Sequence, residues 1–198
     1  SLLDASDISV YYCGIGSAEE YRLAKFLINY SREGDVFYDV GAHLGLYGLL
    51  VREVIQKGEI HAFEPAPRTI DCLKRSLVAD GRTEVFINTF ALSDGIGKVS
   101  FYDKSVGSGD SSGSSTMVAE VISERENPEY RKITVPTSTL DEYIKTRKPP
   151  TLMKIDVEGA ELQVLQGGKE MFEKHSPIII MEAWGGEQGR RKEGETLS

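Results

Sequence analysis

Apolar and polar positions follow two rhythms along this chain, one typical of strands and the other typical of helices. Short apolar runs of strand length lie at 36–40, 59–65, 84–92, 151–157 and 176–184. Segments in which apolar residues recur every three or four positions predict amphipathic helices at 17–33, 44–58, 66–81 and 160–168. A strand–helix–strand order with this spacing predicts a parallel sheet whose crossover helices cover its faces. The last run, 176–184, is apolar enough to predict an interior strand of that sheet.

Two further predicted strands, 97–104 and 132–140, interrupt this order and flank a segment rich in serine and glycine. Such a segment cannot bury a core, and it predicts either a surface insertion or a lid over a substrate. The expected organisation is one domain (1–184) with an N-terminal extension and helix (1–33), a core (34–184) that contains the insertion (about 105–130), and a disordered polar tail (185–198).

Composition narrows the functional classes. Hydrophobic residues make up 40% of the chain and charged residues 27%, which is typical of a globular protein. The formal net charge of −8 argues against a nucleic-acid partner and against an anionic membrane surface. No apolar run approaches the roughly 18 residues of a membrane span. The two cysteines, Cys13 and Cys72, lie far apart and predict free thiols in a reducing, cytoplasmic compartment.

Candidate chemistry begins where the first predicted strand ends, with Asp39 and then a loop that contains Gly41, His43 and Gly45. A dinucleotide-binding loop has the pattern G-x-G-x-x-G, whose glycines bring backbone amides against a pyrophosphate. In this chain His43 replaces the second of those glycines, and the Asp39 carboxylate would repel a pyrophosphate. An acid in this place suits a ligand that carries an ammonium or sulfonium group, such as S-adenosylmethionine.

A second acid, Glu64, ends the next predicted strand, 25 positions after Asp39. A carboxylate there can accept hydrogen bonds from both ribose hydroxyls of a nucleoside. Glu64 alone suits NAD and S-adenosylmethionine equally, whereas the acid-first loop favours the methyl donor. The structural alternatives are a helix cap or turn residue for Asp39 and a solvated strand end for Glu64.

These motifs lie within a longer match to a known family. The matching runs are GDVFYDVGAHLG, GEIHAFEPAPRTIDCLKRSL, ALSDGIGKVSFY, VPTSTLDEYI, LMKIDVEGAELQVLQGG and PIIIMEAW, which cover most of residues 34 to 184. On these runs the chain resembles the FkbM family of class I methyltransferases, and KIDVEGAE after FEP is the most specific combination. The resemblance implies an α/β fold, the Rossmann-like class I methyltransferase fold, with a mostly parallel sheet and helices on both faces. It also implies S-adenosylmethionine as methyl donor and O-methylation of a hydroxyl on a sugar, glycan or secondary metabolite.

The same resemblance implies roles for individual residues of this chain. By this resemblance, the residues expected to line the methionine end of the cofactor are Asp39, Gly41, His43, Gly45 and Asp156. Asp156 is also expected to lie beside the transferred methyl group. The resemblance also implies that Glu64 binds the ribose and that Ala91 and Leu92 flank the adenine. Ser93 and Asp94 are expected near the adenine amino group. Two features depart from the family. His43 stands where the family often has Asn, and only 14 residues follow Trp184, where the fold normally continues with a helix and a hairpin.

Transfer of a methyl group to a hydroxyl requires an aligned acceptor and removal of its proton. The candidate catalytic residues are Asp156, His43 and Glu182. For Glu158 and Glu161 we favour a capping role at the start of the following helix. Three histidines without H-x-x-H or C-x-x-C spacing do not predict a zinc site, and magnesium held by Asp156 and Glu182 is the minor alternative to a metal-free site.

The sequence therefore predicts an S-adenosylmethionine-dependent O-methyltransferase that acts on a small-molecule or glycan acceptor. One rival is a methyltransferase-like module that binds the cofactor without transferring a methyl group. The other is an NAD(P)-linked oxidoreductase, which the acid-first loop disfavours.

Overall fold

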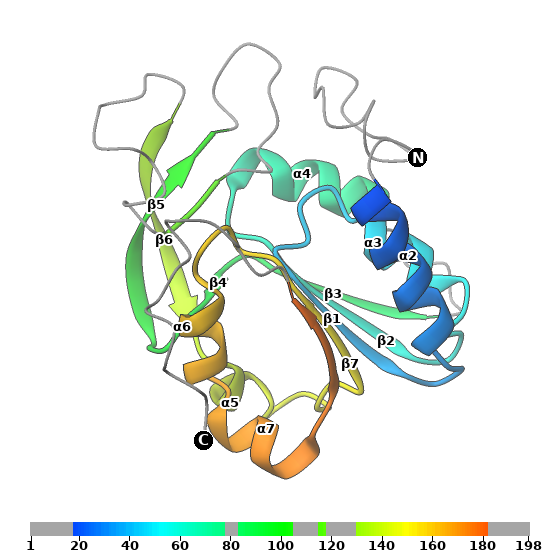
Figure 1. The fold of residues 1–198 in the computed structure, drawn as a ribbon. Helices are drawn as coiled ribbons and strands as arrows, with labels where there is room; N and C mark the ends of the chain where they lie inside the picture. The colour runs from blue at the N-terminus through cyan, green and yellow to red at the C-terminus, as the bar shows by residue number, and fades with distance from the viewer. Residues whose placement is uncertain (1–17, 78–82, 105–114, 118–129, 182–198) are drawn as a thin grey trace.

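The computed structural model describes residues 18–77, 83–104, 115–117 and 130–181, and it shows a central sheet with helices on both faces and a smaller sheet beside it (Figure 1). The elements in chain order are α2 (Ala18–Tyr30), β1 (Val36–Val40), α3 (Leu46–Arg52), β2 (Glu59–Phe63), α4 (Pro67–Ser76), β3 (Glu84–Asn88), β4 (Ala91–Leu92), β5 (Gly97–Asp103), β6 (Arg131–Ser138), α5 (Leu140–Tyr143), β7 (Leu152–Ile155), α6 (Glu161–Gln166), α7 (Lys169–His175) and β8 (Ile178–Met181).

The central sheet has the strand order β3-β2-β1-β7-β8, and every neighbouring pair in it is parallel. This arrangement confirms the predicted parallel sheet. β1 lies in the middle, where the strand order reverses between β2 on one side and β7 on the other. In open sheets of this kind, ligands bind beyond the carboxyl ends of the strands at that point of reversal. The fold therefore places any such site at the ends of β1, β2 and β7.

Alternate residues of the central strands pack on two separate hydrophobic clusters, one on each face of the sheet. Phe37 belongs to the cluster that α2, α3 and α4 complete, whereas its neighbour Tyr38 belongs to the cluster of α5, α6 and α7. Figure 1 shows these two groups of helices on opposite sides of the sheet. The expected helices on both faces are thus confirmed. Among the described residues, no helix combines the length and apolar character needed to cross a lipid bilayer.

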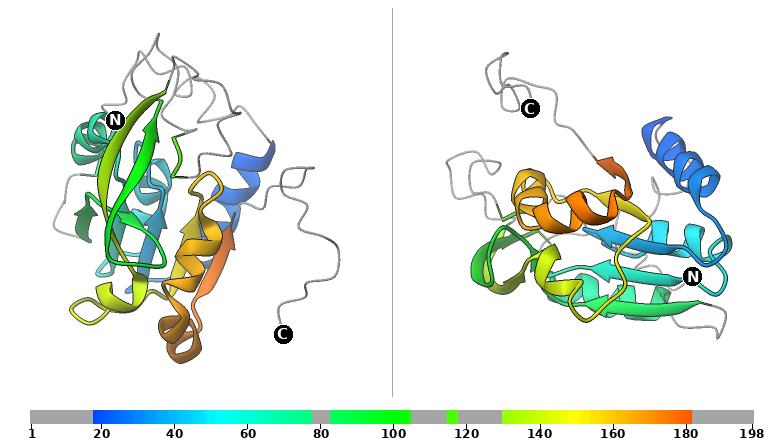
Figure 2. Two further views of the ribbon diagram at one scale, coloured as in Figure 1. Left: turned by 90° about the vertical axis from the view of Figure 1, so that its left-hand side faces the viewer. Right: turned by 90° about the horizontal axis from the view of Figure 1, so that it is seen from below.

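The smaller sheet has the order β4-β6-β5, with β5 and β6 antiparallel. In Figures 1 and 2 it lies at the opposite end of the central sheet from α2. The predicted strand 84–92 is divided between the two sheets, because β3 ends at Asn88 and β4 begins at Ala91. Between them Phe90 packs against the rings of Phe63 and Tyr143, at centroid distances of 5.9 and 6.0 Å. The prediction of one continuous strand was therefore wrong.

Two glycines at the ends of the predicted helices make close backbone contacts. The helix predicted over 44–58 stops at Arg52, and a Cβ on Gly58 would lie 2.1 Å from the Asp35 carbonyl oxygen. The helix predicted over 160–168 stops at Gln166, and a Cβ on Gly167 would lie 2.0 Å from the Ser93 carbonyl oxygen. Both glycines allow backbones to approach more closely than any side chain permits.

Helix α7 was not predicted, because the group that caps it is remote in sequence. The carboxylate of Asp141 accepts hydrogen bonds from the backbone amides of Glu170 and Met171, at 3.2 and 2.8 Å. Asp141 lies in α5, so this cap also joins α5 to α7. A side-chain oxygen in this position stabilises a helix start by roughly 1 kcal/mol.

Strand β8 differs from the prediction of an interior strand. Within the described part of the chain it is the edge of the central sheet, beside β7. Ile178 and Met181 are each 42% exposed. Among the described residues, β8 is therefore apolar without being buried on both faces.

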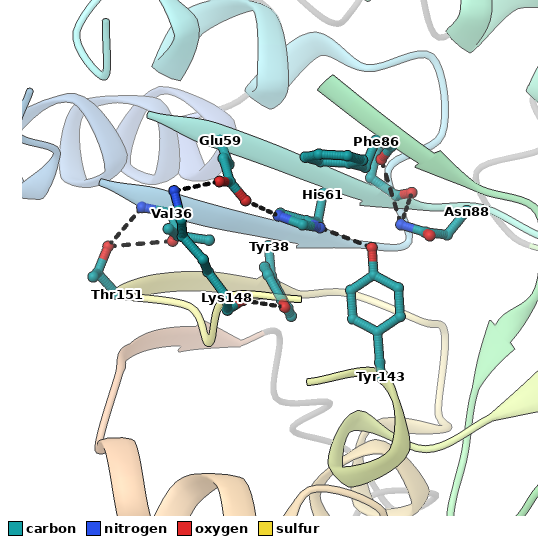
Figure 3. A network of polar contacts seen from close by, with 10 residues as sticks. Val36, Tyr38, Glu59, His61, Phe86, Asn88, Tyr143, Lys148 and Thr151 are labelled. Carbon is teal, nitrogen blue, oxygen red and sulfur yellow. Dashed lines mark hydrogen bonds and ion pairs between the residues drawn. The ribbon is translucent and has the colours of Figure 1, made fainter. Parts of the chain in front are cut away.

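A chain of buried polar groups crosses the face of the sheet that α5 covers (Figure 3). His61 Nδ1 lies 2.7 Å from the Tyr143 hydroxyl, and His61 Nε2 lies 3.0 Å from Oε2 of Glu59. Because an ionised Glu59 can only accept, Nε2 carries the proton and Nδ1 accepts from Tyr143. Lys148 completes the chain with an ion pair to Glu59 at 2.5 Å. This network gives His61 a structural role.

Replacement of His61 is expected to alter stability in acid. Burial lowers the pKa of His61 to about 4, although Glu59 opposes that shift. Between pH 6.5 and 4 the unfolded chain therefore binds a proton that the folded chain does not, and the stabilising contribution of His61 is lost as the pH falls. The free energy of unfolding of the wild type, relative to that of His61→Gln, should decrease by about 3 kcal/mol from pH 7 to pH 4 in urea titrations. His175→Gln, at an exposed position, is the control, and a pH-independent difference for His61→Gln would contradict the prediction.

Candidate active site

The carboxyl ends of β1, β2 and β7 are joined by backbone hydrogen bonds that extend the sheet by one or two residues. The amides of Gly41 and Ala42 both donate to the carbonyl of Phe63, each at 3.0 Å. On the other side, the amide of Asp156 donates to the carbonyl of Val40 at 3.1 Å. The loops that follow the three strands are thereby held close together.

The loop after β1 has an unusual backbone conformation. Gly41, His43 and Gly45 have φ angles of 75°, 50° and 84°, so three of five consecutive residues lie in the left-handed region. At Gly41 no other residue fits, because a Cβ there would lie 1.9 Å from the carbonyl oxygen of Asp156. The left-handed conformation of His43 is uncommon for a non-glycine residue. The loop is therefore specified in detail by its contacts with the neighbouring loops.

Glu64 fixes the other side of this loop. Its Oε2 accepts a hydrogen bond from the His43 amide and its Oε1 accepts one from the Ala66 amide, both at 2.9 Å. The side chain is buried, and burial raises the pKa of Glu64 to about 7, against the lowering effect of the Ala66 and His43 amides and of Lys154. Glu64 thus titrates close to neutral pH, as groups in functional sites often do.

Lys154 lies at the centre of the site, in β7 directly beside Asp39 of β1. Its Nζ donates to the carbonyl of Gly41 at 2.8 Å and forms ion pairs with Asp156 at 3.2 Å and Asp39 at 3.5 Å. Nζ also lies 5.3 Å from the centre of the Tyr47 ring. The side chain is only 3% exposed. Burial lowers the pKa of Lys154, but Asp156 and Asp39 outweigh burial and raise it overall, so the residue is cationic.

Asp39 is fully buried beneath the loop, and its carboxylate faces Lys154. Neither oxygen has a hydrogen-bond partner at normal distance among the described residues. Burial raises the pKa of Asp39, and Lys154 opposes this shift. Asp156 differs, because 32% of its side chain is exposed. Of the two acids that flank Lys154, Asp156 is therefore the one with substantial exposed surface.

The structure brings together most of the residues that the sequence predicted at the methionine and ribose. Asp39, Gly41 and Asp156 all contact Lys154 or its immediate partners, and His43 contacts Glu64. Gly45 ends the loop, where a Cβ would lie 2.7 Å from Leu73. Their contacts with a cofactor stay predictions.

Of the residues predicted at the adenine, Ala91 shares a hydrophobic cluster with Ala66, close to Glu64, and the roles of all four at a cofactor stay predictions. Ala91 and Leu92 form β4 of the smaller sheet, and their side chains are buried in two hydrophobic clusters. Ser93 donates to Asp94 at 3.1 Å, and the Ser93 carbonyl packs on the end of α6. Asn88, the last residue of β3, lies beside Glu64, and its carbonyl accepts a hydrogen bond from the Glu64 amide at 3.0 Å.

The loop after β7 is held by Glu161 and by the insertion between β5 and β6. Glu161 Oε1 accepts hydrogen bonds from the amides of Val157 and Gly159, both at 3.2 Å, so it binds the loop before α6 and not the first amides of the helix, as the expected capping role would require. Glu158 has a left-handed backbone, with φ 53°, and its carbonyl accepts a hydrogen bond from the buried Thr116 hydroxyl at 2.6 Å. Thr116 thereby ties one described part of the insertion to the site.

Glu182 and Trp184 lie outside the described residues, so the catalytic role predicted for Glu182 stays a prediction. Within the described ranges, no three His, Cys, Asp or Glu side chains are grouped closely enough to hold a metal ion.

Sequence reasoning missed Lys154 and Thr116 as parts of the site. The signal for Lys154 was present, because it is a charged residue inside the otherwise apolar strand TLMKIDV. A buried lysine requires a carboxylate partner, and Asp39 and Asp156 were already candidates. No comparable signal marks Thr116, which lies within a serine-rich segment.

Comparison with known proteins adds independent information. A family model described as "Methyltransferase FkbM domain" matches residues 39–193. "Hexuronic acid methyltransferase AglP" of Haloferax volcanii is 26% identical over 163 residues, which cover 81% of this chain and 61% of that protein. "Methyltransferase sdnD" of Sordaria araneosa is 30% identical over 173 residues, which cover 74% of this chain and 65% of that protein. The chain thus spans less than two thirds of either relative.

A solved structure supports the same fold. The crystal structure of methyltransferase FkbM from Methylobacillus flagellatus matches with a TM-score of 0.51 and 15% sequence identity, covering 81% of this chain and 40% of that chain. At this identity the likeness shows the fold alone. It confirms the expected class I methyltransferase fold.

Removal of the buried ammonium is expected to destabilise the protein. Lys154→Met leaves Asp39 buried without its counter-charge, a change that costs about 3–5 kcal/mol in other proteins. Urea unfolding monitored by circular dichroism measures the loss, and Asp39→Asn added to Lys154→Met should restore part of it. Lys57→Met is the matched control, since Lys57 pairs with Glu33 in solvent and should hardly alter the unfolding midpoint. Similar losses in the two single variants would contradict a central role for Lys154.

Proposed function

The chain belongs to the FkbM methyltransferase family, and we propose that it transfers a methyl group from S-adenosylmethionine to a hydroxyl oxygen of a sugar, glycan or small metabolite. The observation that carries this proposal is the group of three acids at the ends of neighbouring strands. Asp39 and Asp156 flank Lys154, and Glu64 holds the loop between them. Two carboxylates paired with one ammonium, and a third carboxylate on the other side of the loop, favour a cationic ligand over an anionic one.

The residues present fit S-adenosylmethionine better than a dinucleotide. The ligand carries a sulfonium and an ammonium, which an acidic site attracts, whereas a pyrophosphate would be repelled by Asp156. When bound, S-adenosylmethionine supplies a methyl group already activated for displacement by its positive sulfur. The protein then has to hold the donor, orient the acceptor and exclude water.

We assign Glu64 to the ribose. Each of its oxygens accepts one backbone amide, and these two bonds fix the plane of the carboxylate. A carboxylate oxygen has two lone pairs, so each oxygen can accept a further hydrogen bond from a ligand hydroxyl. Glu64 is therefore both oriented and able to bind.

We assign Asp156 to the methionine ammonium and Asp39 to an indirect, positioning role. Asp156 is the partly exposed acid of the group, whereas Asp39 reaches the site only through Lys154. An ammonium beside Asp156 stabilises its charged form and makes it a weak base. We therefore favour a binding role for Asp156 over a role as the base that removes the acceptor proton.

The nature of the acceptor follows from the relatives rather than from the geometry. One relative is named as a hexuronic acid methyltransferase, and both relatives are larger than this chain. Sugars, including sugars with a carboxylate, are accordingly the first acceptors to test.

Binding of the demethylated product tests the donor assignment. S-adenosylhomocysteine at a hundredfold excess over its Kd should raise the melting temperature by roughly 5–10 °C, whereas NAD should not. Glu64→Gln should weaken binding by about ten- to a hundredfold, because charge-assisted hydrogen bonds to the ribose are lost. Glu158→Gln, which leaves the Glu158 backbone contact to Thr116 in place, is the control. Equal losses in both variants would show that the ribose contact is misassigned.

The same titration has a predicted pH dependence. Since the pKa of Glu64 is raised to about 7, the ionised form that accepts ribose hydroxyls is lost as the pH falls through 7. Affinity for S-adenosylhomocysteine should decrease by up to about tenfold per pH unit below that value. Glu64→Gln should show a flat profile between pH 7 and 5.

Transfer itself is tested with a methyl-labelled donor and a panel of neutral and carboxylated sugars. We expect label in an alkali-stable methyl ether, since the proposed acceptor atom is a hydroxyl oxygen. Label that is released by mild alkali would indicate a methyl ester and would contradict O-methylation of a hydroxyl. Binding of the donor without transfer to any acceptor would favour the rival binding module.

A further inference from the structure

A groove of about 920 Å³ runs between the start of α4 and the strand β6 of the smaller sheet. In Figure 1, α4 lies between the smaller sheet, which contains β6, and α3. Its volume lies within the range of pockets that bury small ligands. The proposed function assigns no role to it.

The walls of the groove are mainly apolar and rigid. Pro65, Pro67 and Ile70 line the α4 side, and Ile133, Val135 and Pro136 line the β6 side. Val135 is buried in a cluster with Ala66, so the two walls are packed together at the base. Apolar walls of this kind suit the hydrophobic faces of a sugar ring.

Charged groups are concentrated in the same groove. Arg68 and Arg131 both line it, together with Asp103, and Asp103 is only 4% exposed. Asp103 and Arg131 are direct partners in the register of β5 and β6. Two guanidinium groups and one carboxylate leave an excess of one positive charge, in a chain whose formal net charge is −8.

The groove adjoins the proposed ribose contact. Pro65 and Pro67 flank Ala66, whose amide donates to Glu64. The charge of Asp103 also contributes to the raised pKa of Glu64, after burial as the main cause. A ligand in the groove would therefore lie beside the nucleoside end of the cofactor site.

We propose that this groove is a subsite for a sugar unit that carries a carboxylate, in an acceptor bound beside the nucleoside end of the cofactor site. The forked guanidinium of Arg131 or Arg68 matches a carboxylate with two parallel hydrogen bonds. A carboxylate matches the one excess positive charge of the groove, whereas a phosphate dianion would exceed it. This inference rests on the proposed function and names the class of acceptor.

The test compares pairs of ligands that differ in one group. Methyl β-D-glucuronide and methyl β-D-galacturonide are titrated against methyl β-D-glucoside and methyl β-D-galactoside, each with and without saturating S-adenosylhomocysteine. At least one uronide should bind about tenfold more tightly than its neutral counterpart. Arg131→Gln and Arg68→Gln should each remove most of that preference and leave the affinity for S-adenosylhomocysteine unchanged.

Lys132→Gln is the matched control for Arg131→Gln. Lys132 is the next residue of β6 and does not line the groove. Its ammonium lies 5.7 Å from the centre of the Tyr102 ring. The control should keep the preference for the uronide. If Lys132→Gln lowers the preference for the uronide as much as Arg131→Gln does, the preference reflects general surface charge and the proposal is wrong.

The remaining outcomes separate this inference from the proposed function. If the affinity for the uronide is the same in the wild type and in both arginine variants, the groove is not the binding site and the proposal is wrong, even where donor binding and methyl transfer are intact. If glucose 6-phosphate binds more tightly than the uronides and depends on the same arginines, the groove binds a phosphate and the proposed carboxylate ligand is wrong. Failure to bind S-adenosylhomocysteine would contradict the proposed function instead. The titrations without cofactor would still show whether the groove binds the uronides.

Discussion

The placement of one ammonium group, that of Lys154, determines the geometry of the whole carboxyl edge of the sheet. Its Nζ bonds the Gly41 carbonyl at 2.8 Å and pairs with acids from β1 and from the end of β7. A lysine buried to this extent is tolerable only with such partners. Gly41 is in turn pressed against the Asp156 carbonyl, so the loop after β1 has one position available to it. The His43 amide then points at Glu64 because the loop that carries it is fixed.

Burial favours the neutral form of both His61 and Glu64, which lie in and just beyond the same strand, but the two groups differ in what they can still bind. His61, on one face of β2, has both ring nitrogens bonded to partners, and burial keeps it neutral. Glu64, just beyond the same strand, also has both oxygens bonded, yet burial raises its pKa to about 7. The first network is complete within the protein. The second retains lone pairs that can accept hydrogen bonds from a ligand, which distinguishes a binding site from a structural polar cluster.

The sequence predicted those parts of the structure that depend on local pattern. Strand periodicity and the acid-first loop sufficed for the parallel sheet and for the grouping of Asp39, Gly41 and Asp156, because these residues end adjacent strands. Helix α7 could not be predicted from its own residues, since its cap is Asp141 in α5. The same holds for the break after Asn88. It depends on ring contacts of Phe90 that form only in the folded chain.

The smaller sheet connects the two ends of the site that the central sheet creates. Ala66, next to the ribose contact, is packed in a cluster with Val135 of β6. At the other end, Thr116, paired with Tyr102 of β5, donates to the Glu158 carbonyl after β7. One antiparallel hairpin thus contacts the loop after β2 and the loop after β7. Because both loops also carry the proposed donor contacts, the hairpin is the part of the protein best placed to set which acceptor reaches the methyl group. Variation in that hairpin could then change the acceptor without altering the donor site, since Lys154, Gly41 and Glu64 all belong to the central sheet and its loops.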